Sequence, residues 1–383
     1  MTFAFWLVAL AIVYATVGYP LLVLGLAKLR PPRPVTAPEA PLSVDFVIPA
    51  HNEADVIEQK VANTLAQAAS VEHRVRVLVV SDGSGDGTVD RARVAGGDEV
   101  EVLDLQPRQG KVSALNAAIG QLEGDVAVFS DANAMLVPGA LAALVRHYGD
   151  PGVGGVCGAI RIEKAARAGL ASSEGLYWRY DQAVKRAESH LGGAVSAQGS
   201  FHSVRRKHLA PLPLDAADDF TLSVRAVEGG GRLVFEPAAV AVETVTEKAG
   251  KEIMRRVRST ERGWRALMSQ AGLLNPARTG FYAVQLFSHK VLRRLVPFLL
   301  VLLFMVNAAI LDAGPFYRAA FAAQAVFYAV GILGLFVPAL RPVPGFRHVA
   351  FALMALAAMA AGIVNYYRGK RSTIWAPVRD SAG

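Results

Sequence analysis

The sequence predicts an α/β domain on a mainly parallel sheet, flanked by helices that cross or lie in a membrane. Between about residues 40 and 275, apolar strand-like runs alternate with helical patterns, as in a parallel sheet with helices on both faces. On either side of that range lie long uncharged stretches, and 53% of the residues are hydrophobic. A soluble enzyme of 383 residues seldom has so apolar a composition, so we expect membrane segments.

Residues 1–30 predict an N-terminal transmembrane helix. No charged residue occurs in positions 1–27, and at about 1.5 Å of rise per residue this stretch crosses a hydrocarbon core of about 30 Å. Lys28, Arg30 and Arg33 follow it, so the positive-inside rule puts the next domain in the cytoplasm. A cleaved signal peptide is the alternative, but it would start with a charged segment and have a shorter apolar core, so we expect an anchor.

Residues 295–367 predict three further transmembrane or membrane-embedded helices, which are the uncharged stretches 295–311, 319–340 and 349–367. Directly before them, residues 279–294 place apolar side chains at helical spacing and basic ones on the other faces. This pattern predicts an amphipathic helix at the membrane interface, and an ordinary surface helix is the alternative.

Residues 368–383 form a basic C-terminal tail, and the side of the membrane on which it lies stays open. Four spans that begin outside would return the C-terminus to the outside, whereas Arg368, Lys370 and Arg371 favour the inside. Either the last apolar segment does not cross fully, or the charge rule does not hold here. The net charge of +8 is better explained by the membrane than by nucleic acid, since no zinc-finger spacing or RNA-binding signature occurs.

The central domain, residues 40–275, follows a proline-rich linker and predicts strands and helices in alternation. The only cysteine, Cys157, cannot form an internal disulfide and implies no oxidising compartment, so we expect a buried structural thiol. The predicted strands are 44–48, 75–80, 100–105 and 126–129, and the predicted helices are 54–69, 87–94 and 111–122.

Polar side chains follow three of the predicted strands, at the carboxyl edge where such sheets bind ligands. The loops are Pro49–Glu53 after the first strand, Ser81–Thr88 after the second and Ser130–Asn133 after the fourth. One glycine-rich loop would be weak evidence, but three loops that converge on one edge predict a ligand site.

Four residues in and near these loops suit nucleotide and metal binding. Asp82 can accept a hydrogen bond from a base or ribose, and Asp131 with Asn133 offers oxygen ligands for Mg²⁺ or Mn²⁺ beside a diphosphate. Lys111 opens a helix and can meet phosphate there. Each has a plain structural alternative, which is a turn or helix cap for the acidic residues and a solvated side chain for the lysine.

Two further groups lie closer to the C-terminus. Asp218 and Asp219 precede an apolar-leaning helix, so that one can cap the helix while the other takes a proton from an attacking hydroxyl group. Arg258 belongs to a cluster of five arginines between positions 255 and 265. Guanidinium groups suit diphosphate oxygens and, nearly as well, anionic lipid headgroups.

Together these motifs resemble glycosyltransferase family 2, the inverting enzymes of the GT-A fold, over roughly residues 42 to 265. The resemblance implies an α/β GT-A domain, Rossmann-like and mainly parallel, with flanking transmembrane helices. It also implies that a nucleotide-sugar binds across four positions near the strand edge, Ala50, Glu53, Asp82 and Lys111.

The same resemblance implies the remaining roles. Asp131 matches the start of the family's Asp-x-Asp motif, and Arg258 would help to offset charge on the leaving nucleotide diphosphate. Asp219, with Asp218 beside it, matches the catalytic base that deprotonates the acceptor hydroxyl. The acceptor-side loop corresponds to three adjacent residues, Gln198, Gly199 and Ser200.

Three departures from the family pattern bear on the mechanism. Asn133 replaces the second aspartate of the metal motif, and Asp218 replaces the usual glutamate before the base. Of the Gln-x-x-Arg-Trp motif of processive synthases, residues 255–259 keep only Arg258. We therefore expect a single-addition or short-chain enzyme. A processive polysaccharide synthase and a non-catalytic membrane scaffold that binds a nucleotide-sugar are the alternatives.

The resemblance implies Mg²⁺ or Mn²⁺ as cofactor and a nucleotide-sugar, first of all a UDP-sugar, as donor. The expected acceptor is a lipid-linked or saccharide molecule of envelope polysaccharide or glycolipid synthesis, and membrane lipids are further partners. We expect a multi-pass protein of the inner (plasma) membrane, with its catalytic domain in the cytoplasm and no nucleic-acid partner.

Overall fold

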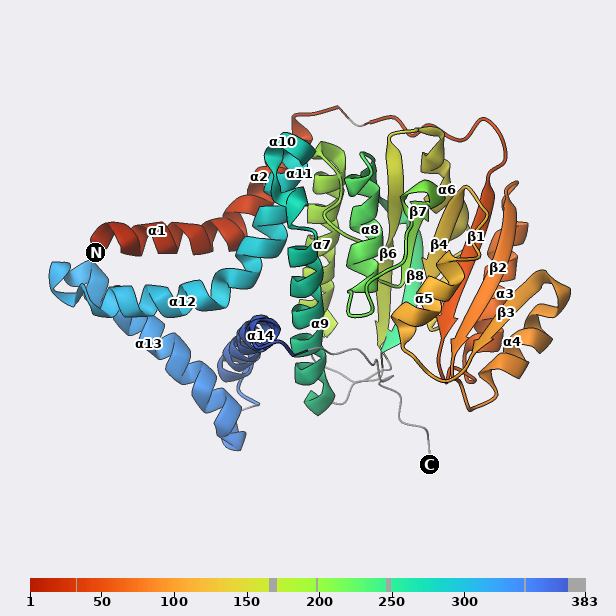
Figure 1. Ribbon diagram of the computed structural model, residues 1–383. Coiled ribbons are helices and arrows are strands. Elements are labelled where there is room, and N and C mark those ends of the chain that lie inside the picture. The colour runs from red at the N-terminus through yellow and green to blue at the C-terminus, as the bar shows by residue number, and fades with distance from the viewer. Residues whose placement is uncertain (32, 165–170, 198, 246–248, 341, 371–383) are drawn as a thin grey trace. The chain divides into compact units, whose positions relative to one another are not determined.

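The computed structural model describes residues 1–31, 33–164, 171–197, 199–245, 249–340 and 342–370, and these form two compact units (Figure 1). The sheet unit comprises Val23–Thr246 and Ser269–Ala283. The helical unit comprises Met1–Leu22, Glu247–Met268 and Val284–Lys370.

An eight-stranded sheet in the order β3-β2-β1-β4-β7-β6-β8-β5 forms the sheet unit. Strands β3, β2, β1 and β4 run parallel to one another, as predicted, but β7 is antiparallel to both β4 and β6, and β5 is antiparallel to β8. The α/β prediction is therefore confirmed for a sheet that is mixed rather than uniformly parallel. The strands are β1 Ser43–Ala50, β2 Arg74–Asp82, β3 Val100–Leu105, β4 Val126–Ser130, β5 Ala134–Leu136, β6 Val153–Lys164, β7 Phe201–Arg205 and β8 Arg232–Val245.

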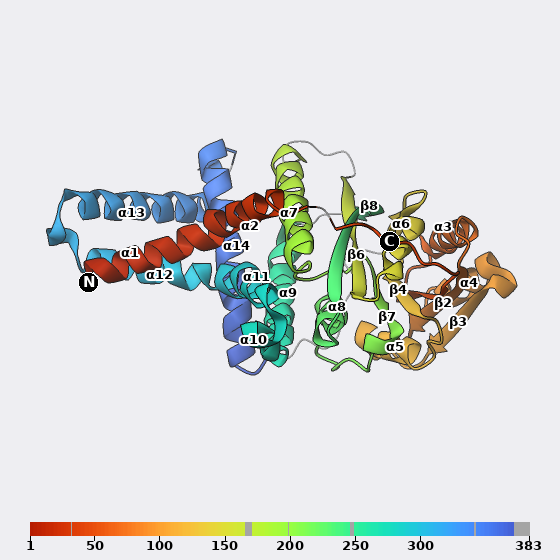
Figure 2. The same ribbon diagram turned by 90° about the horizontal axis from the view of Figure 1, so that it is seen from above.

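Helices cover both faces of this sheet. Figure 2 shows α5 and α8 on one side of the sheet, and α3 and α6 on the other. The helices of this unit are α3 Ile57–Ala69, α4 Thr88–Gly96, α5 Lys111–Ile119, α6 Ala140–Val145, α7 Ala171–Leu191, α8 Asp218–Glu228 and α10 Pro276–Thr279.

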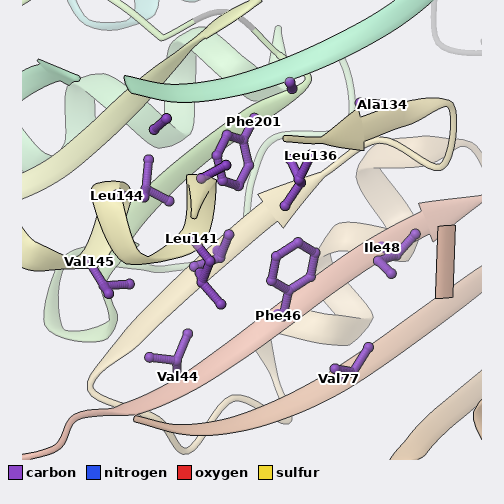
Figure 3. Close-up of a cluster of buried hydrophobic side chains, with 14 of the residues drawn as sticks. Val44, Phe46, Ile48, Val77, Ala134, Leu136, Leu141, Leu144, Val145 and Phe201 are labelled. Atoms are coloured by element: carbon purple, nitrogen blue, oxygen red, sulfur yellow. The ribbon is translucent and has the colours of Figure 1, made fainter. Parts of the chain in front are cut away.

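The alternation of side chains along β1 divides the core of the sheet unit into two layers. Val44, Phe46 and Ile48 pack with side chains of α3 and α6 (Figure 3), whereas Val47 faces the layer that contains α5 and α8. All four are at most 1% exposed, so the strand is anchored from both sides and its carboxyl end is held in place. Cys157 on β6 is buried and forms no disulfide, as predicted.

Within the part of the chain that the structure describes, four helices are long and apolar enough to cross a membrane, by length and composition: Thr2–Lys28, Phe281–Ala308, Pro315–Phe336 and Pro344–Tyr367. In the helical unit, rings of the first helix pack against those of the third, with Phe5 5.3 Å from Tyr317 between centroids and Trp6 stacked on Phe316. Many large apolar side chains of these helices are exposed, for example Leu10 at 62% and Phe336 at 77%. Such surfaces are stable in contact with lipid. The helices are α1 Thr2–Val13, α2 Tyr19–Lys28, α9 Ala249–Ser269, α11 Phe281–Leu286, α12 Arg293–Ala308, α13 Pro315–Phe336 and α14 Pro344–Tyr367.

The predicted interfacial helix and the span after it form one helix, Phe281–Ala308, without a break between them. The helix bends (Figure 1), and it contains two features that bend helices, a π-helical stretch at Phe287–Leu292 and Pro297. A sequence pattern cannot distinguish a bent helix from two separate ones, because both keep the same spacing of apolar residues.

Candidate active site

The loops after β1 and β2 are joined by hydrogen bonds into one rim at the carboxyl edge of the sheet. Oδ1 of Asn52 accepts a hydrogen bond from the Gly85 backbone amide (3.0 Å), and the backbone amide of Asn52 donates to Ser84 Oγ (3.2 Å). The Glu53 amide donates to Thr88 Oγ1 (2.9 Å). Two residues predicted to bind the nucleotide, Ala50 and Glu53, are 5% and 7% exposed in this rim.

Asp82, at the end of β2, holds the loop that leads into α5. Its Oδ1 accepts a hydrogen bond from the Gln109 amide (2.7 Å) and its Oδ2 accepts one from the Gly110 amide (2.8 Å). Oδ2 also lies 3.9 Å from Nε of Arg108, and Asp82 is 3% exposed. Asp82 thereby fixes the start of α5, and its predicted contact with the nucleotide stays a prediction.

Lys111, the first residue of α5, connects two carboxylates from different parts of the chain. Its Nζ lies 2.8 Å from Oδ1 of Asp131, which follows β4, and 2.9 Å from Oδ2 of Asp218, which begins α8. Burial alone would lower the pKa of Lys111, but the attraction of the two carboxylates outweighs it and raises that pKa. The side chain is therefore protonated at neutral pH, and the alternative of a solvated lysine is wrong.

Asp131 and Asn133 lie in a short turn between β4 and β5. The turn is fixed by the Asp131 amide, which donates to Ser200 O (3.3 Å), and by the Ala134 amide, which donates to Asp131 O (3.1 Å). Within the described residues, Oδ2 of Asp131 and the side chain of Asn133 form no hydrogen bond. Carboxylate and amide oxygens are ligands that suit Mg²⁺ and Mn²⁺, so this pair fits a divalent cation. Among the described residues, no group of three or more His, Cys, Asp or Glu side chains is arranged so that it could hold a metal ion, so substrate oxygens would have to complete such a site.

Asp218 and Asp219 are the first two residues of α8, and Ala217 occupies the N-cap position without a side-chain capping bond. Oδ1 of Asp219 accepts a hydrogen bond from the Phe220 amide (2.8 Å), which is one of the first-turn amides that have no partner within the helix. Asp219 therefore helps to cap the helix from its second position. A Cβ atom added to Gly199 would lie 3.6 Å from Oδ2 of Asp219, so Gly199 borders the carboxylate closely. The structure thus brings the predicted acceptor-side loop and the predicted base together.

Two of the predicted site residues, Gln198 and Arg258, are not among the residues gathered around Lys111. Gln198 lies outside the described residues. Arg258 is on α9 in the helical unit, so its predicted role at the diphosphate stays a prediction.

Three polar residues next to the site were not predicted to have a function there. Lys60 of α3 and His202 of β7 are 0% and 2% exposed, and the imidazole stacks on Phe129 with centroids 5.3 Å apart. Asn116 of α5 exchanges two hydrogen bonds with the backbone of Leu212 (2.9 and 2.6 Å), in the loop that leads to α8. Lys60 alone leaves a signal in the sequence, because it occupies a position of the apolar stripe of its helix.

The sheet unit is similar in sequence to known proteins. Residues 45–210 match the family model described as Glycosyl transferase family 2. An N-acetylglucosaminyltransferase of Rhizobium sp. (strain N33) is 26% identical over 232 residues, which cover 56% of this chain and 51% of that protein. A poly-beta-1,6-N-acetyl-D-glucosamine synthase of Staphylococcus aureus (strain MSSA476) is 25% identical over 232 residues, which cover 59% and 55%. The chain spans about half the length of these curated relatives.

A solved structure shows the same fold over nearly the whole chain. It is a mannosyltransferase from Pyrobaculum calidifontis in complex with GDP-Man and Mn²⁺, with a TM-score of 0.71 and 23% identity. The match covers 96% of this chain and 100% of that one. It confirms the predicted architecture of an α/β domain with flanking helices.

Proposed function

We propose that the chain is a glycosyltransferase of family 2, whose model matches residues 45–210, and that it transfers a sugar from a nucleotide-sugar to a hydroxyl group of a lipid-linked or saccharide acceptor at a membrane. The observation that carries this proposal is the network in which Lys111 joins Asp131 to Asp218, with Asp219 adjacent. One ammonium group and three carboxylates gather at the strand edge where α/β sheets bind ligands. This set can bind a diphosphate and accept a proton within one site.

The donor diphosphate would lie at the start of α5. Lys111 offers a positive charge there, and the first amides of a helix favour anions. The rim that contains Ala50, Glu53 and Asp82 would hold the nucleoside, and Arg258 would add a guanidinium group. A UDP-sugar is the first donor to test, and GDP-mannose is the second because the structural neighbour was solved with GDP-Man.

Asp131 and Asn133 would hold a divalent cation on the diphosphate. When bound there, Mg²⁺ or Mn²⁺ supplies positive charge that stabilises the leaving nucleoside diphosphate. Lys111 contributes to the same stabilisation, because its ammonium group contacts Asp131 directly at 2.8 Å.

Asp219 would act as the general base. Its Oδ1 accepts a hydrogen bond from the Phe220 amide, and its Oδ2 lies on the side of Gly199, where the acceptor hydroxyl would bind. Removal of the hydroxyl proton in the transition state, with in-line attack on the anomeric carbon, would invert the configuration there. Gly199 and Ser200 would then border the acceptor.

The apolar helices would keep the enzyme in the inner (plasma) membrane with its sheet unit in the cytoplasm. A lipid-linked acceptor is favoured, because residues 255–259 retain only Arg258 of the motif found in processive synthases. A processive polysaccharide synthase is the second candidate, and the relative from Staphylococcus aureus that bears the name of such a synthase favours it.

Nucleotide release by the purified protein in lipid tests the proposal. The donors are UDP-N-acetylglucosamine, other UDP-sugars, GDP-mannose and dTDP-sugars, each with Mg²⁺ or Mn²⁺ and a membrane lipid extract as acceptor. Release from one donor that is lost in Asp219→Asn would support a transferase, and the length of the product would separate single addition from polymerisation. Donor binding without release under all these conditions would support a non-catalytic scaffold instead.

A further inference from the structure

One face of α3 fastens the segment after β4 through side-chain hydrogen bonds. Asn63 exchanges two hydrogen bonds with the backbone of Leu136 (2.9 and 2.8 Å). Gln67, one turn further, donates to Val137 O (2.9 Å). Lys60 precedes Asn63 by three residues and therefore lies on the same face, closest to the catalytic edge. This polar row lies beside the apolar side chains Ile57 and Val61, through which α3 packs into the core.

Lys60 forms a hydrogen bond at each end of the turn that contains Asp131 and Asn133. Its Nζ donates to Ser130 Oγ (2.7 Å), directly before the turn, and to Ala134 O (2.5 Å), directly after it. The side chain is completely buried, and its ammonium group lies 5.5 Å from the centroid of the Phe46 ring. The two bonded atoms and the ring define the position of the ammonium group closely.

This arrangement is costly for stability alone. In the described part of the chain no ion pair joins Lys60 to a carboxylate, and burial lowers its pKa to about 7, while the charge of Asp131 opposes that shift. A methionine of similar length would fill the same space without desolvating a charge. The polar contacts of Lys60 are therefore better explained by what they do to the turn than by packing.

We propose that Lys60 is a positioning residue of the nucleotide-sugar site, which sets the turn so that the oxygens of Asp131 and Asn133 face the donor diphosphate and its divalent cation. The inference rests on the proposed function. Lys60 touches neither donor nor acceptor and acts through its hydrogen bonds to Ser130 Oγ and Ala134 O and through the electrostatic field of its ammonium group at Asp131. Its loss should therefore weaken binding of the cation and donor more than it slows the chemical step.

The test compares Lys60→Met with Asn63→Leu, which breaks the same polar row at β5, away from the turn. Binding of Mn²⁺ in the presence of UDP or GDP is measured by the EPR signal of the free ion. Unfolding is followed with a thiol-reactive fluorogenic dye, since Cys157 is the only cysteine and is buried. We expect Lys60→Met to weaken Mn²⁺ binding and to raise the donor KM by about tenfold, with a smaller change in kcat. Asn63→Leu should lower the unfolding temperature and leave Mn²⁺ binding nearly unchanged.

Equal loss of Mn²⁺ binding in both variants, or none in a folded Lys60→Met, would overturn the inference. If Lys60→Met does not fold, Ser130→Ala tests the inference instead. This variant removes one of the two hydrogen-bond acceptors of Lys60 and leaves the lysine in place. That variant should weaken Mn²⁺ binding by about threefold, and unchanged binding would count against the role of Lys60. If the wild-type protein binds neither nucleotide with Mn²⁺, the proposed function itself fails, which is a different result from a defect confined to Lys60.

Discussion

Lys111 and Asp218 tie together the first residues of two helices that are more than a hundred positions apart in the chain, with Nζ of one 2.9 Å from Oδ2 of the other. The same ammonium group lies 2.8 Å from Asp131. Two carboxylates on one cation would repel each other without it, so Lys111 holds Asp131 and Asp218 close together. Under the proposed function, donor binding and proton transfer would both depend on this side chain.

Replacing Lys111 by methionine should impair donor binding strongly. The change removes the charge that neutralises Asp131 and Asp218 and leaves both carboxylates in a partly buried place, where loss of one partner of an ion pair is costly. We expect the donor KM to rise by about tenfold or more, measured by nucleotide release at saturating Mn²⁺. Lys207→Met, at an exposed lysine, is the matched control, and a Lys111→Met enzyme with the KM of that control would exclude this role.

Asp219→Asn should reduce turnover without loss of donor binding. An amide cannot accept the proton of the acceptor hydroxyl, and general-base catalysis typically contributes about 10²- to 10⁴-fold. The side chain keeps nearly the same shape, so the hydrogen bond from the Phe220 amide can persist. Turnover is measured with saturating donor and acceptor, and donor binding by calorimetry. Asp90→Asn, on the exposed surface of α4, controls for the loss of one charge, and near-normal turnover of Asp219→Asn would require another base.

Asn133→Asp should tighten the binding of the divalent cation. A neutral amide oxygen is a weaker ligand than a carboxylate for Mg²⁺ or Mn²⁺, and the side chain of Asn133 has no hydrogen bond to lose within the described residues. We expect the Mn²⁺ concentration for half-maximal nucleotide release to fall several-fold, and Asp131→Asn to raise it. If Asn133→Asp leaves the Mn²⁺ dependence unchanged, residue 133 is not a ligand.

Sequence alone could predict the parts of the site that lie at the ends of predicted strands. Asp82 and Asp131 follow apolar runs that can only be buried strands, and the carboxyl ends of parallel strands meet at one edge. Asp219 was predicted through a family motif rather than through spacing, because its distance from the other two along the chain contains no geometric information.

The rest depends on contacts that a single sequence does not encode. Lys60 has the charge of a surface residue, and its burial follows from two acceptors, Ser130 and Ala134, about 70 positions away. The partner of Asn116, the backbone of Leu212, is likewise known only from the fold. The antiparallel direction of β7 could not be predicted either, since the sequence of a five-residue strand does not indicate the direction in which it pairs.

Asn116→Ala should destabilise the sheet unit and slow the chemical step. The variant leaves the amide and the carbonyl of Leu212 without their partners, which costs about 1–3 kcal/mol where they are buried. Leu212 lies in the loop that precedes α8, so a shift there would displace Asp218 and Asp219. We expect a lower unfolding temperature, followed through Cys157, together with a fall in kcat that exceeds the change in donor KM. If Asn116→Ala lowers the unfolding temperature but leaves kcat unchanged, the hydrogen bonds to Leu212 do not position Asp218 and Asp219.

His202 should make the protein sensitive to acid. Burial lowers the pKa of this imidazole from 6.5 to about 4, with the charge of Lys111 acting in the same direction and that of Asp218 opposing it. Between these two pH values the unfolded chain binds a proton that the folded chain does not, so stability is lost as the pH falls from 6.5 toward 4.

The variant His202→Phe tests this prediction, because a phenylalanine can still stack on Phe129 but has no group that titrates. As the pH falls from 6.5 to 4, the unfolding free energy of the wild type should fall relative to that of this variant by on the order of 3 kcal/mol. Other titrating groups act on both proteins alike, so parallel pH curves would show that His202 is already protonated or remains exposed to water in the folded protein.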